Sequence, residues 1–227
     1  MSFALSGSAA APRFVRVVRR ARFAVGALGA VVLARLVFLV WELRLHAGPR
    51  PPAPPGDPED GYHRVPTALE EQYHYLGDLT ALTLVVCVLG LVYWLQAMRD
   101  NADVLAPEVQ RHARPWVWFS WIVPGISVWF PRDVVVDVWR AAAPRDENPA
   151  ERRTPWWINV WWLFLLGAVA MLLVTENLSD DGQPEAETVY DAFRSVLATD
   201  FFLVAAAVLT IVLVVRMTRD QEERTGD

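Results

Sequence analysis

The sequence contains no lysine and a single cysteine among its 227 residues. One cysteine cannot form an intrachain disulfide, which excludes a small disulfide-stapled secreted domain. Hydrophobic residues make up 54% of the chain, which excludes a disordered polar chain, and the net charge of −5 argues against nucleic acid as a partner. There is no Ser–His–Asp order, glycine-rich phosphate loop or zinc-hydrolase motif. We therefore expect neither an enzyme nor a bound cofactor.

Long apolar runs are the main feature that the sequence does have. A helix needs about 20 mostly apolar residues to cross the hydrocarbon core of a bilayer. A soluble domain does not normally carry several such runs, so the sequence predicts an all-α, polytopic membrane helical bundle. The four predicted transmembrane helices are 23–45, 76–98, 156–175 and 200–217.

A fifth apolar run, 116–130, is too short to cross, and Pro124 and Gly125 lie at its centre. Proline has no amide hydrogen to donate, so it interrupts a helix. Runs of this length more often lie in the membrane interface or enter and return. We therefore expect a re-entrant or interfacial segment here.

The residues that follow, 132–142, have the spacing of a short amphipathic helix. Asp133, Asp137 and Arg140 share its polar face, and valines occupy the opposite face. We expect Arg140 to neutralise Asp137 and the helix to lie on the membrane surface or against the bundle.

The arginines predict the orientation, because cytoplasmic loops collect basic residues. They concentrate in the tail 1–22, in 99–155 and in the tail 218–227, whereas 46–75 and 176–199 are acidic. We expect the first three to be cytoplasmic and the last two external, so that both termini are in the cytoplasm. A cleavable signal peptide is a less favoured alternative for the first span, because that apolar run is unusually long.

The external segment 46–75 begins with a proline-rich loop, which should be stiff and extended. Thr67 and Glu70 then fit a capping box, in which each side chain bonds the other residue's amide. The second helix is therefore expected to begin near Ala68 and to extend beyond the membrane.

Arg35 is the most unusual residue in the spans, because it lies about 18 Å along a helix that begins at residue 23. An arginine at this depth costs at least about 2.5 kcal/mol unless it is paired or reaches the interface. One hypothesis is an ion or anion site facing Thr80, Thr83 or Asp78. The alternative is a structural pair or a snorkelling side chain. A functional role predicts that Arg35→Leu inserts normally but alters activity.

Glu70, His74 and Asp78 follow one another at four-residue intervals, which places them on one face of the second helix. Carboxylate and imidazole groups can bind zinc or similar ions. The sequence therefore offers a candidate metal site here, and the alternative is a solvated acidic face.

Tryptophans gather near the ends of the apolar runs, as in the headgroup belts of membrane proteins. An aromatic ligand site is the alternative. Examples are Trp41, Trp94, Trp156, Trp157, Trp161 and Trp162.

The stretch from Trp94 to Trp157 contains a series of motifs. They are Arg99-x-Asn101 at the end of a span, Trp121-x-x-Pro124, Pro131, a short helix ending at Trp139, and Trp156–Trp157 at the start of the next span. This series resembles the bacterial membrane-protein family called domain of unknown function 4328. The resemblance implies a multi-pass protein of the bacterial plasma membrane, and it implies no activity.

From the residues themselves, Arg99 and Asn101 are expected to cap the end of the second helix. A ligand pocket is expected between 116–130 and the second and third spans. The candidate ligand-binding residues are Arg35, Arg99, Asn101, Trp121, Pro124, Pro131 and Trp139.

The sequence thus favours a non-enzymatic membrane component that binds a partner or a lipid. Its expected partners are the lipid bilayer and a membrane or envelope protein. A homo-oligomer is a further alternative. The alternative is a small transporter or channel subunit that uses Arg35 and the broken segment at Pro124.

Overall fold

The computed structural model describes residues 14–48, 67–179 and 193–226. These residues form six α-helices and two short 3-10 turns, and they contain no strand, so the all-α prediction is confirmed. The predictions made for the N-terminal tail before residue 14, for the proline-rich loop and for the centre of the acidic segment lie outside the described residues.

Four of the helices are long and apolar enough to cross a membrane. Each contains one of the four predicted apolar runs, so the four-span bundle is confirmed and the chain is a multi-pass membrane protein. The helices are α1 (Val18–Ala47), α2 (Ala68–Leu105), α5 (Trp156–Ser179) and α7 (Phe193–Thr225).

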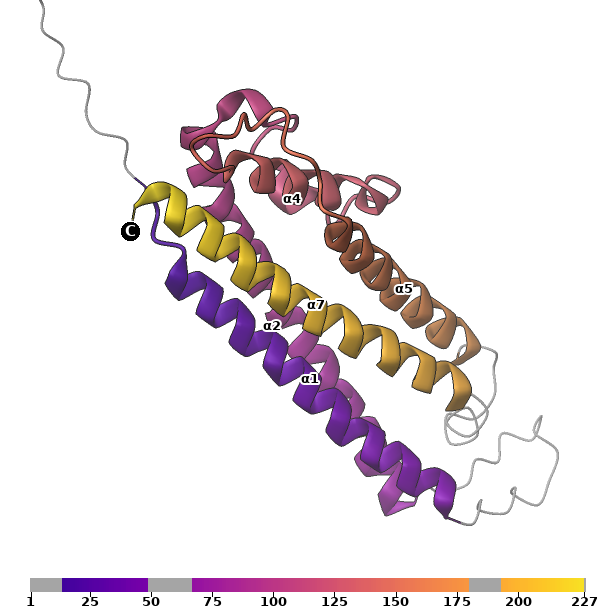
Figure 1. The fold of residues 1–227 in the computed structure, drawn as a ribbon. Helices are drawn as coiled ribbons and strands as arrows, with labels where there is room; N and C mark the ends of the chain where they lie inside the picture. Colours follow the sequence, from indigo (N-terminus) through magenta and orange to yellow (C-terminus); the bar gives the residue numbers. More distant parts are fainter. Residues whose placement is uncertain (1–13, 49–66, 180–192, 227) are drawn as a thin grey trace, which may run out of the picture.

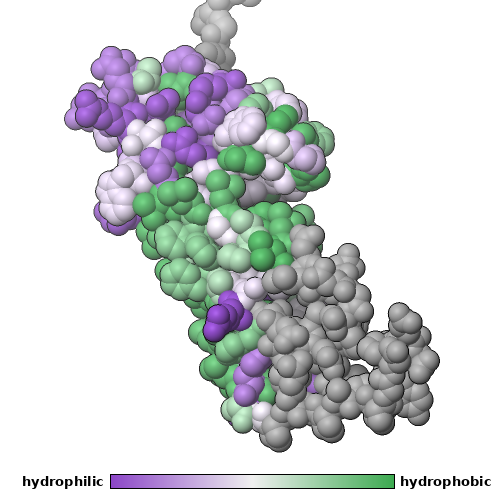
Figure 2. Space-filling model, turned by 90° about the vertical axis from the view of Figure 1, so that its right-hand side faces the viewer, coloured by the Kyte–Doolittle hydropathy of each residue, from purple (hydrophilic) through white to green (hydrophobic). Residues whose placement is uncertain are grey.

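The four long helices pack as antiparallel neighbours in the order α2, α1, α7, α5 (Figure 1). The remaining short elements lie across one end of the bundle, against α2 and α5. We call this the cap end, and the opposite end the far end. Figure 2 shows a band of apolar surface below a hydrophilic cap. Exposed side chains such as Leu33, Leu82, Leu163 and Val215 contribute to the apolar surface of the helices.

The packed face of α1 follows an alternating spacing of four and three residues. This spacing is the heptad pattern of a helix that packs along a continuous seam. Arg35 and Glu42 both occupy this seam, so two ionisable side chains are enclosed among apolar ones. The buried residues are Val17, Ala21, Ala24, Leu28, Val31, Arg35, Phe38, Glu42 and Leu45.

The short run 116–130 does not form a spanning helix. It contains α3 (Trp116–Phe119) and the 3-10 turn η3 (Ile126–Val128), joined by a turn in which Gly125 has a φ of 79°. That backbone conformation suits glycine, which has no Cβ. The chain thus folds back on the cap, and the choice between a re-entrant and an interfacial position stays a prediction.

The predicted amphipathic helix is α4 (Phe130–Ala141), and it begins two residues before the expected start. Pro131 lies in its first turn, where a missing amide hydrogen costs nothing. The helix packs against the bundle, and its polar face is covered as well, because Asp137 is buried along with Val136 and Val138. α4 is covered on both sides because it lies between α2, α5 and the turns of the cap.

Two helices approach each other closely at Gly167 of α5. A Cβ at this position would lie 2.6 Å from the ring of Phe202 on α7, closer than real Cβ contacts. We expect Gly167→Ala to lower the free energy of unfolding by about 1–3 kcal/mol through overpacking. Denaturation of the purified protein in detergent measures this. Gly29→Ala is the control, because a Cβ there meets nothing within 4 Å; equal stability of the two variants would contradict the predicted contact.

Candidate functional site

Arg35 is buried in the bundle, with its side chain 9% exposed, and it forms an ion pair with Asp200 of α7. Its guanidinium also lies 4.6 Å from the centre of the Phe38 ring. The expected partners on α2 are wrong. Asp78 is exposed, and the hydroxyl of Thr80 donates to the carbonyl of Leu76 at 2.8 Å. The seam of α1 faces α7 as well as α2, and the nearest available carboxylate comes from α7.

The candidate metal site on α2 is not assembled. Glu70 is buried, and its carboxylate accepts from the amide of Thr67 at 2.7 Å and from the Thr67 hydroxyl at 3.0 Å. The capping box is thereby confirmed. His74 and Asp78 are exposed. Among the described residues, no three His, Cys, Asp or Glu side chains lie close enough together to hold a metal ion.

Asn101 joins three parts of the chain at the cap end. Its side chain accepts from the amide of Val15 at 2.7 Å and donates to the carbonyl of Val15 at 2.9 Å. It also donates to the side-chain oxygen of Gln221 at 3.0 Å, and Gln221 donates to the carbonyl of Met98 at 2.9 Å. The predicted capping role is wrong, because α2 continues to Leu105.

Arg99 fastens the loop after α2 onto that helix. Its guanidinium is buried and donates to the carboxylate of Asp103 at 3.0 Å and to the carbonyl of His112 at 2.7 Å. Arg114 donates to the other oxygen of Asp103 at 2.5 Å. Arg99 therefore bonds the following loop instead of the last carbonyls of its own helix.

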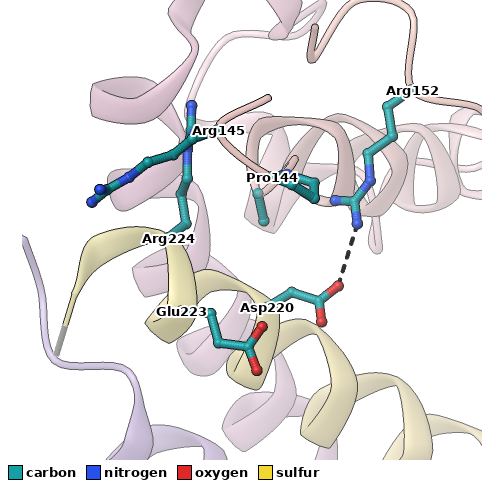
Figure 3. Close-up of a pocket in the computed structure, with 7 residues that line it drawn as sticks. Pro144, Arg145, Arg152, Asp220, Glu223 and Arg224 are labelled. Carbon is teal, nitrogen blue, oxygen red and sulfur yellow. Dashed lines mark hydrogen bonds and ion pairs between the residues drawn. The ribbon is translucent and has the colours of Figure 1, made fainter. Parts of the chain in front are cut away.

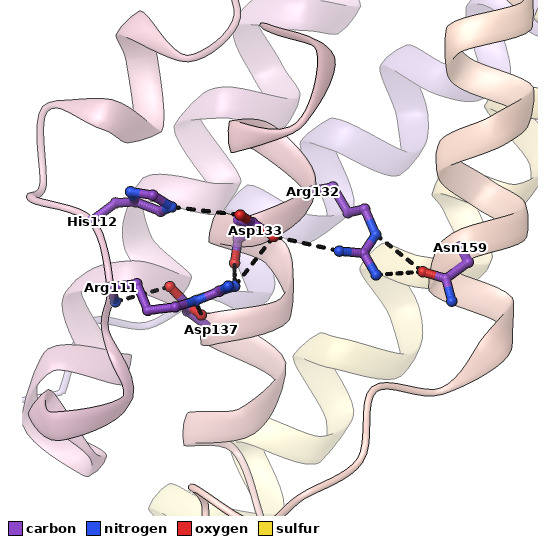
Figure 4. Close-up of polar contacts among 6 residues, drawn as sticks. All are labelled: Arg111, His112, Arg132, Asp133, Asp137 and Asn159. Carbon is purple, nitrogen blue, oxygen red and sulfur yellow. Dashed lines mark hydrogen bonds and ion pairs between the residues drawn. The ribbon is translucent and has the colours of Figure 1, made fainter. Parts of the chain in front are cut away.

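Asp137 is paired with Arg111, and the expected pairing with Arg140 is wrong (Figure 4). Arg111 donates its backbone amide and its side chain to the two carboxylate oxygens, at 3.0 Å and 2.7 Å. Partial burial lowers the pKa of Arg111, but its hydrogen bonds to Asp137 and the charges of Asp137 and Asp133 outweigh burial and raise it overall. Arg132 then connects this cluster to Asn159 of α5 at 2.6 Å.

The remaining proline and tryptophan candidates shape the turns of the cap. The ring of Trp121 meets that of Trp162 edge to face at 6.5 Å, and Trp162 donates to the carbonyl of Val128 at 2.9 Å. Pro124 is exposed, whereas Pro131 is buried at the start of α4. These residues do not form a ligand pocket with Arg99 and Asn101.

A pocket of about 400 Å³ lies between the loop after α4 and the last turns of α7 (Figure 3). Three arginines surround it, and two acidic residues of α7 form one wall. Its lining residues are Ala142, Pro144, Arg145, Arg152, Asp220, Glu223 and Arg224.

A second pocket of about 270 Å³ shares Asp220 and Glu223 with the first. We call the two together the cap pocket. Trp139, Trp157, Arg216 and Arg219 complete its second part. Trp139 is the one sequence-predicted candidate in the cap pocket.

Arginines and tryptophans alternate across the cap pocket. The guanidinium of Arg152 lies 3.7 Å from the centre of the Trp139 ring, and that of Arg216 lies 5.5 Å from the Trp157 ring. The two rings meet edge to face at 5.5 Å. Arg152 also donates to the carbonyl of Trp139 at 2.6 Å. This ladder connects the loop before α5 with α4, α5 and α7, and it fixes the shape of the pocket.

The cap pocket holds more basic than acidic side chains, and two of its arginines are paired within it, Arg152 with Asp220 at 3.5 Å and Arg219 with Glu223 at 2.8 Å. Burial lowers the pKa of Arg152, and the carboxylates of Asp220 and Glu147 act in the opposite direction. The Nη1 atom of Arg224 is buried and has no hydrogen-bond partner among the described residues. The α7 arginines were not predicted as site residues, although their position directly after an apolar run was a signal.

The fold and the cap pocket together define a multi-pass, all-α membrane protein with an arginine–tryptophan pocket at one end. The model of the family described as Domain of unknown function (DUF4328) matches residues 68–219. The chain belongs to this family, as the motifs between Trp94 and Trp157 indicated. No curated protein and no solved structure matches the chain. The matched residues begin with α2, so α1 and Arg35 lie outside them.

Proposed function

We propose that this protein is a non-enzymatic component of the bacterial plasma membrane that binds the phosphate headgroup of an anionic lipid in its cap pocket. The observation that carries the proposal is the gathering of five arginines around two adjoining pockets. Arginine is well suited to phosphate because its planar guanidinium donates in pairs to phosphate oxygens.

The tryptophans support a lipid as the source of the phosphate. Trp156 and Trp157 open α5, and tryptophan favours the headgroup level of a membrane. Arg216 contacts the ring of Trp157, and Asp220 and Glu223 follow it one and two turns later on α7. The cap pocket is thus adjacent to the expected headgroup level, where a lipid phosphate can enter without leaving its bilayer.

The cap end is assigned to the cytoplasmic side as part of the proposal. The described arginines concentrate there, and cytoplasmic loops are enriched in basic residues. The cytoplasmic leaflet carries anionic lipids, which attract each nearby basic residue by about 1 kcal/mol. Both the orientation and the ligand therefore rest on the same charge distribution.

Arg145→Gln and Arg224→Gln are the variants that test lipid binding, because no side-chain hydrogen bond or ion pair of either arginine holds the described part of the cap together. We expect each to weaken binding about tenfold through the loss of a charge-assisted hydrogen bond. Binding is measured in phosphatidylcholine nanodiscs that contain increasing phosphatidylglycerol. The control is Arg194→Gln, because Arg194 is exposed at the far end.

The same experiment separates a lipid from a soluble anion. Competition by inorganic phosphate, without any preference for phosphatidylglycerol, would identify a soluble phosphate ligand and overturn the lipid proposal. Equal lipid retention by the two variants and the control would overturn the site itself.

The second candidate is a small transporter or channel subunit. The observation that favours it is the Arg35–Asp200 ion pair inside an apolar bundle, because intramembrane ionisable residues often mark transport pathways. Ion or solute flux in liposomes tests it. Flux that is indifferent to substitutions at Arg35 and Pro124 would remove this candidate.

A further inference from the structure

Glu42 is a second ionisable side chain on the buried seam of α1, seven residues after Arg35. It is 1% exposed. Neither of its carboxylate oxygens has a hydrogen-bond partner among the described residues. A carboxylate that is buried, charged and unpaired is costly, so this side chain requires a compensating partner or a proton.

Charged and titratable groups lie on the packed faces of all three helices at the far-end half of the bundle. On α1 they are Arg35 and His46, whose ring nitrogen lies 3.1 Å from the backbone oxygen of Glu42. On α2 the buried face presents Tyr73 and Glu70, and the Glu70 carboxylate accepts from the Thr67 side chain and backbone. On α7 the group is Asp200.

Within this set, the Glu70 carboxylate is held by its hydrogen bonds to Thr67, and one permanent positive charge, that of Arg35, serves the other two carboxylates, those of Glu42 and Asp200. Arg35 cannot lose its proton at ordinary pH, and it is already paired with Asp200. No ion pair joins Arg35 to Glu42 among the described residues. With both carboxylates ionised, this part of the bundle would carry one uncompensated negative charge. The binding of a single proton removes it.

We propose that Glu42 is a proton-binding site inside the membrane bundle. The Glu42 carboxylate accepts one proton from water at the far end and becomes a neutral carboxylic acid, while Asp200 stays ionised beside Arg35. Release of the proton returns the negative charge to the bundle and places two carboxylates in competition for one guanidinium. The site is independent of the cap pocket, which lies at the opposite end of the helices.

Infrared spectroscopy of the protein in lipid nanodiscs tests the proposal, because a protonated carboxyl group has its own carbonyl band. We expect one such band at neutral pH in the wild type and its loss in Glu42→Gln, which keeps the size and removes the charge. Glu71→Gln is the control, because Glu71 is exposed at the same end and the band should remain. A band that survives in Glu42→Gln would overturn the assignment.

Asp200→Asn provides a second test that a purely structural Glu42 would not satisfy. With Asp200 neutral, Arg35 has only Glu42 left to pair with, so Glu42 should lose its proton and the neutral-pH band should disappear. A band unchanged by this substitution would contradict the shared guanidinium. Loss of the wild-type band on adding sodium at constant pH would identify a metal cation as the occupant and overturn the proton site.

If a variant does not accumulate, the infrared spectrum of the wild type alone tests whether Glu42 binds a proton. The absence of any protonated carboxyl band from the wild type at neutral pH would overturn the proposal.

Discussion

Asp200→Leu is expected to lower the free energy of unfolding by about 3–5 kcal/mol, because it leaves the charge of Arg35 buried without its ion-pair partner. Replacing both residues with leucine is expected to restore most of that loss, since an apolar pair of similar size avoids the desolvation of two charges. Unfolding of the purified protein in detergent, compared between the single and double variants, measures both effects.

The surroundings of the ion pair provide the controls for this prediction. Asp78→Leu removes an exposed carboxylate from α2 and should change stability by less than about 0.5 kcal/mol. Adding Glu42→Gln to Asp200→Leu also removes the carboxylate on the seam of α1, so Arg35 is left with neither carboxylate and this combination should be the least stable of the set. If Asp200→Leu and its combination with Glu42→Gln are both as stable as the wild type, Arg35 is not enclosed as the structure shows.

The Arg35–Asp200 pair also connects two parts of the chain with different relationships to the family. Asp200 lies within the residues that match the family model, whereas Arg35 lies on α1, before the match begins. Loss of the pair should therefore loosen α1 from α7 while the contacts between α5 and α7 persist. Faster hydrogen exchange confined to α1 in Asp200→Leu would be the signature of this loosening.

The sequence predicted the four spans because their length and apolar composition are properties of single segments. The capping box at Thr67 likewise depends only on residues close together in the sequence. The four spans and the capping box were both confirmed. The partner of Arg35 was not predictable in the same way, since it depends on which helices become neighbours. Asp200 is the first residue of the predicted fourth span, and nothing in its local sequence indicates that it faces Arg35. The alternating spacing of α1 was the available signal that Arg35 and Glu42 share a packed seam.

The errors at the cap have a common physical cause. Asn101 was expected at a helix end because the apolar run stops before it, but a helix continues for as long as its backbone is hydrogen-bonded. The pairing of Asp137 with Arg140 was predicted from their spacing along one helix, whereas the observed partner, Arg111, lies in a turn distant in the sequence. The cap pocket likewise combines a loop with the end of α7. Such contacts between separate segments leave little trace in local spacing.

Asn101→Ala is expected to be the most damaging substitution at the cap end. It removes three hydrogen bonds and leaves the amide and carbonyl of Val15 and the side-chain oxygen of Gln221 without this partner. A buried polar group left unsatisfied costs about 1–3 kcal/mol, so we expect a loss of about 3 kcal/mol or more. Thermal unfolding measures the loss, and proteolysis of the segment before α1 should become faster.

Asn148→Ala is the matched control, because Asn148 is exposed and bonds only within its own loop, to Glu151 and Ala150. It should change stability by less than about 1 kcal/mol and leave the N-terminal segment protected. The contrast separates a general effect of losing an asparagine from the loss of the three-way junction. If Asn101→Ala melted like this control while the segment before α1 stayed protected, the junction would not hold that segment to α2 and α7. Lipid retention by Asn101→Ala then discriminates between a structural and a ligand-binding role of Asn101. A purely structural residue should lower lipid retention only in proportion to the unfolding that its substitution causes.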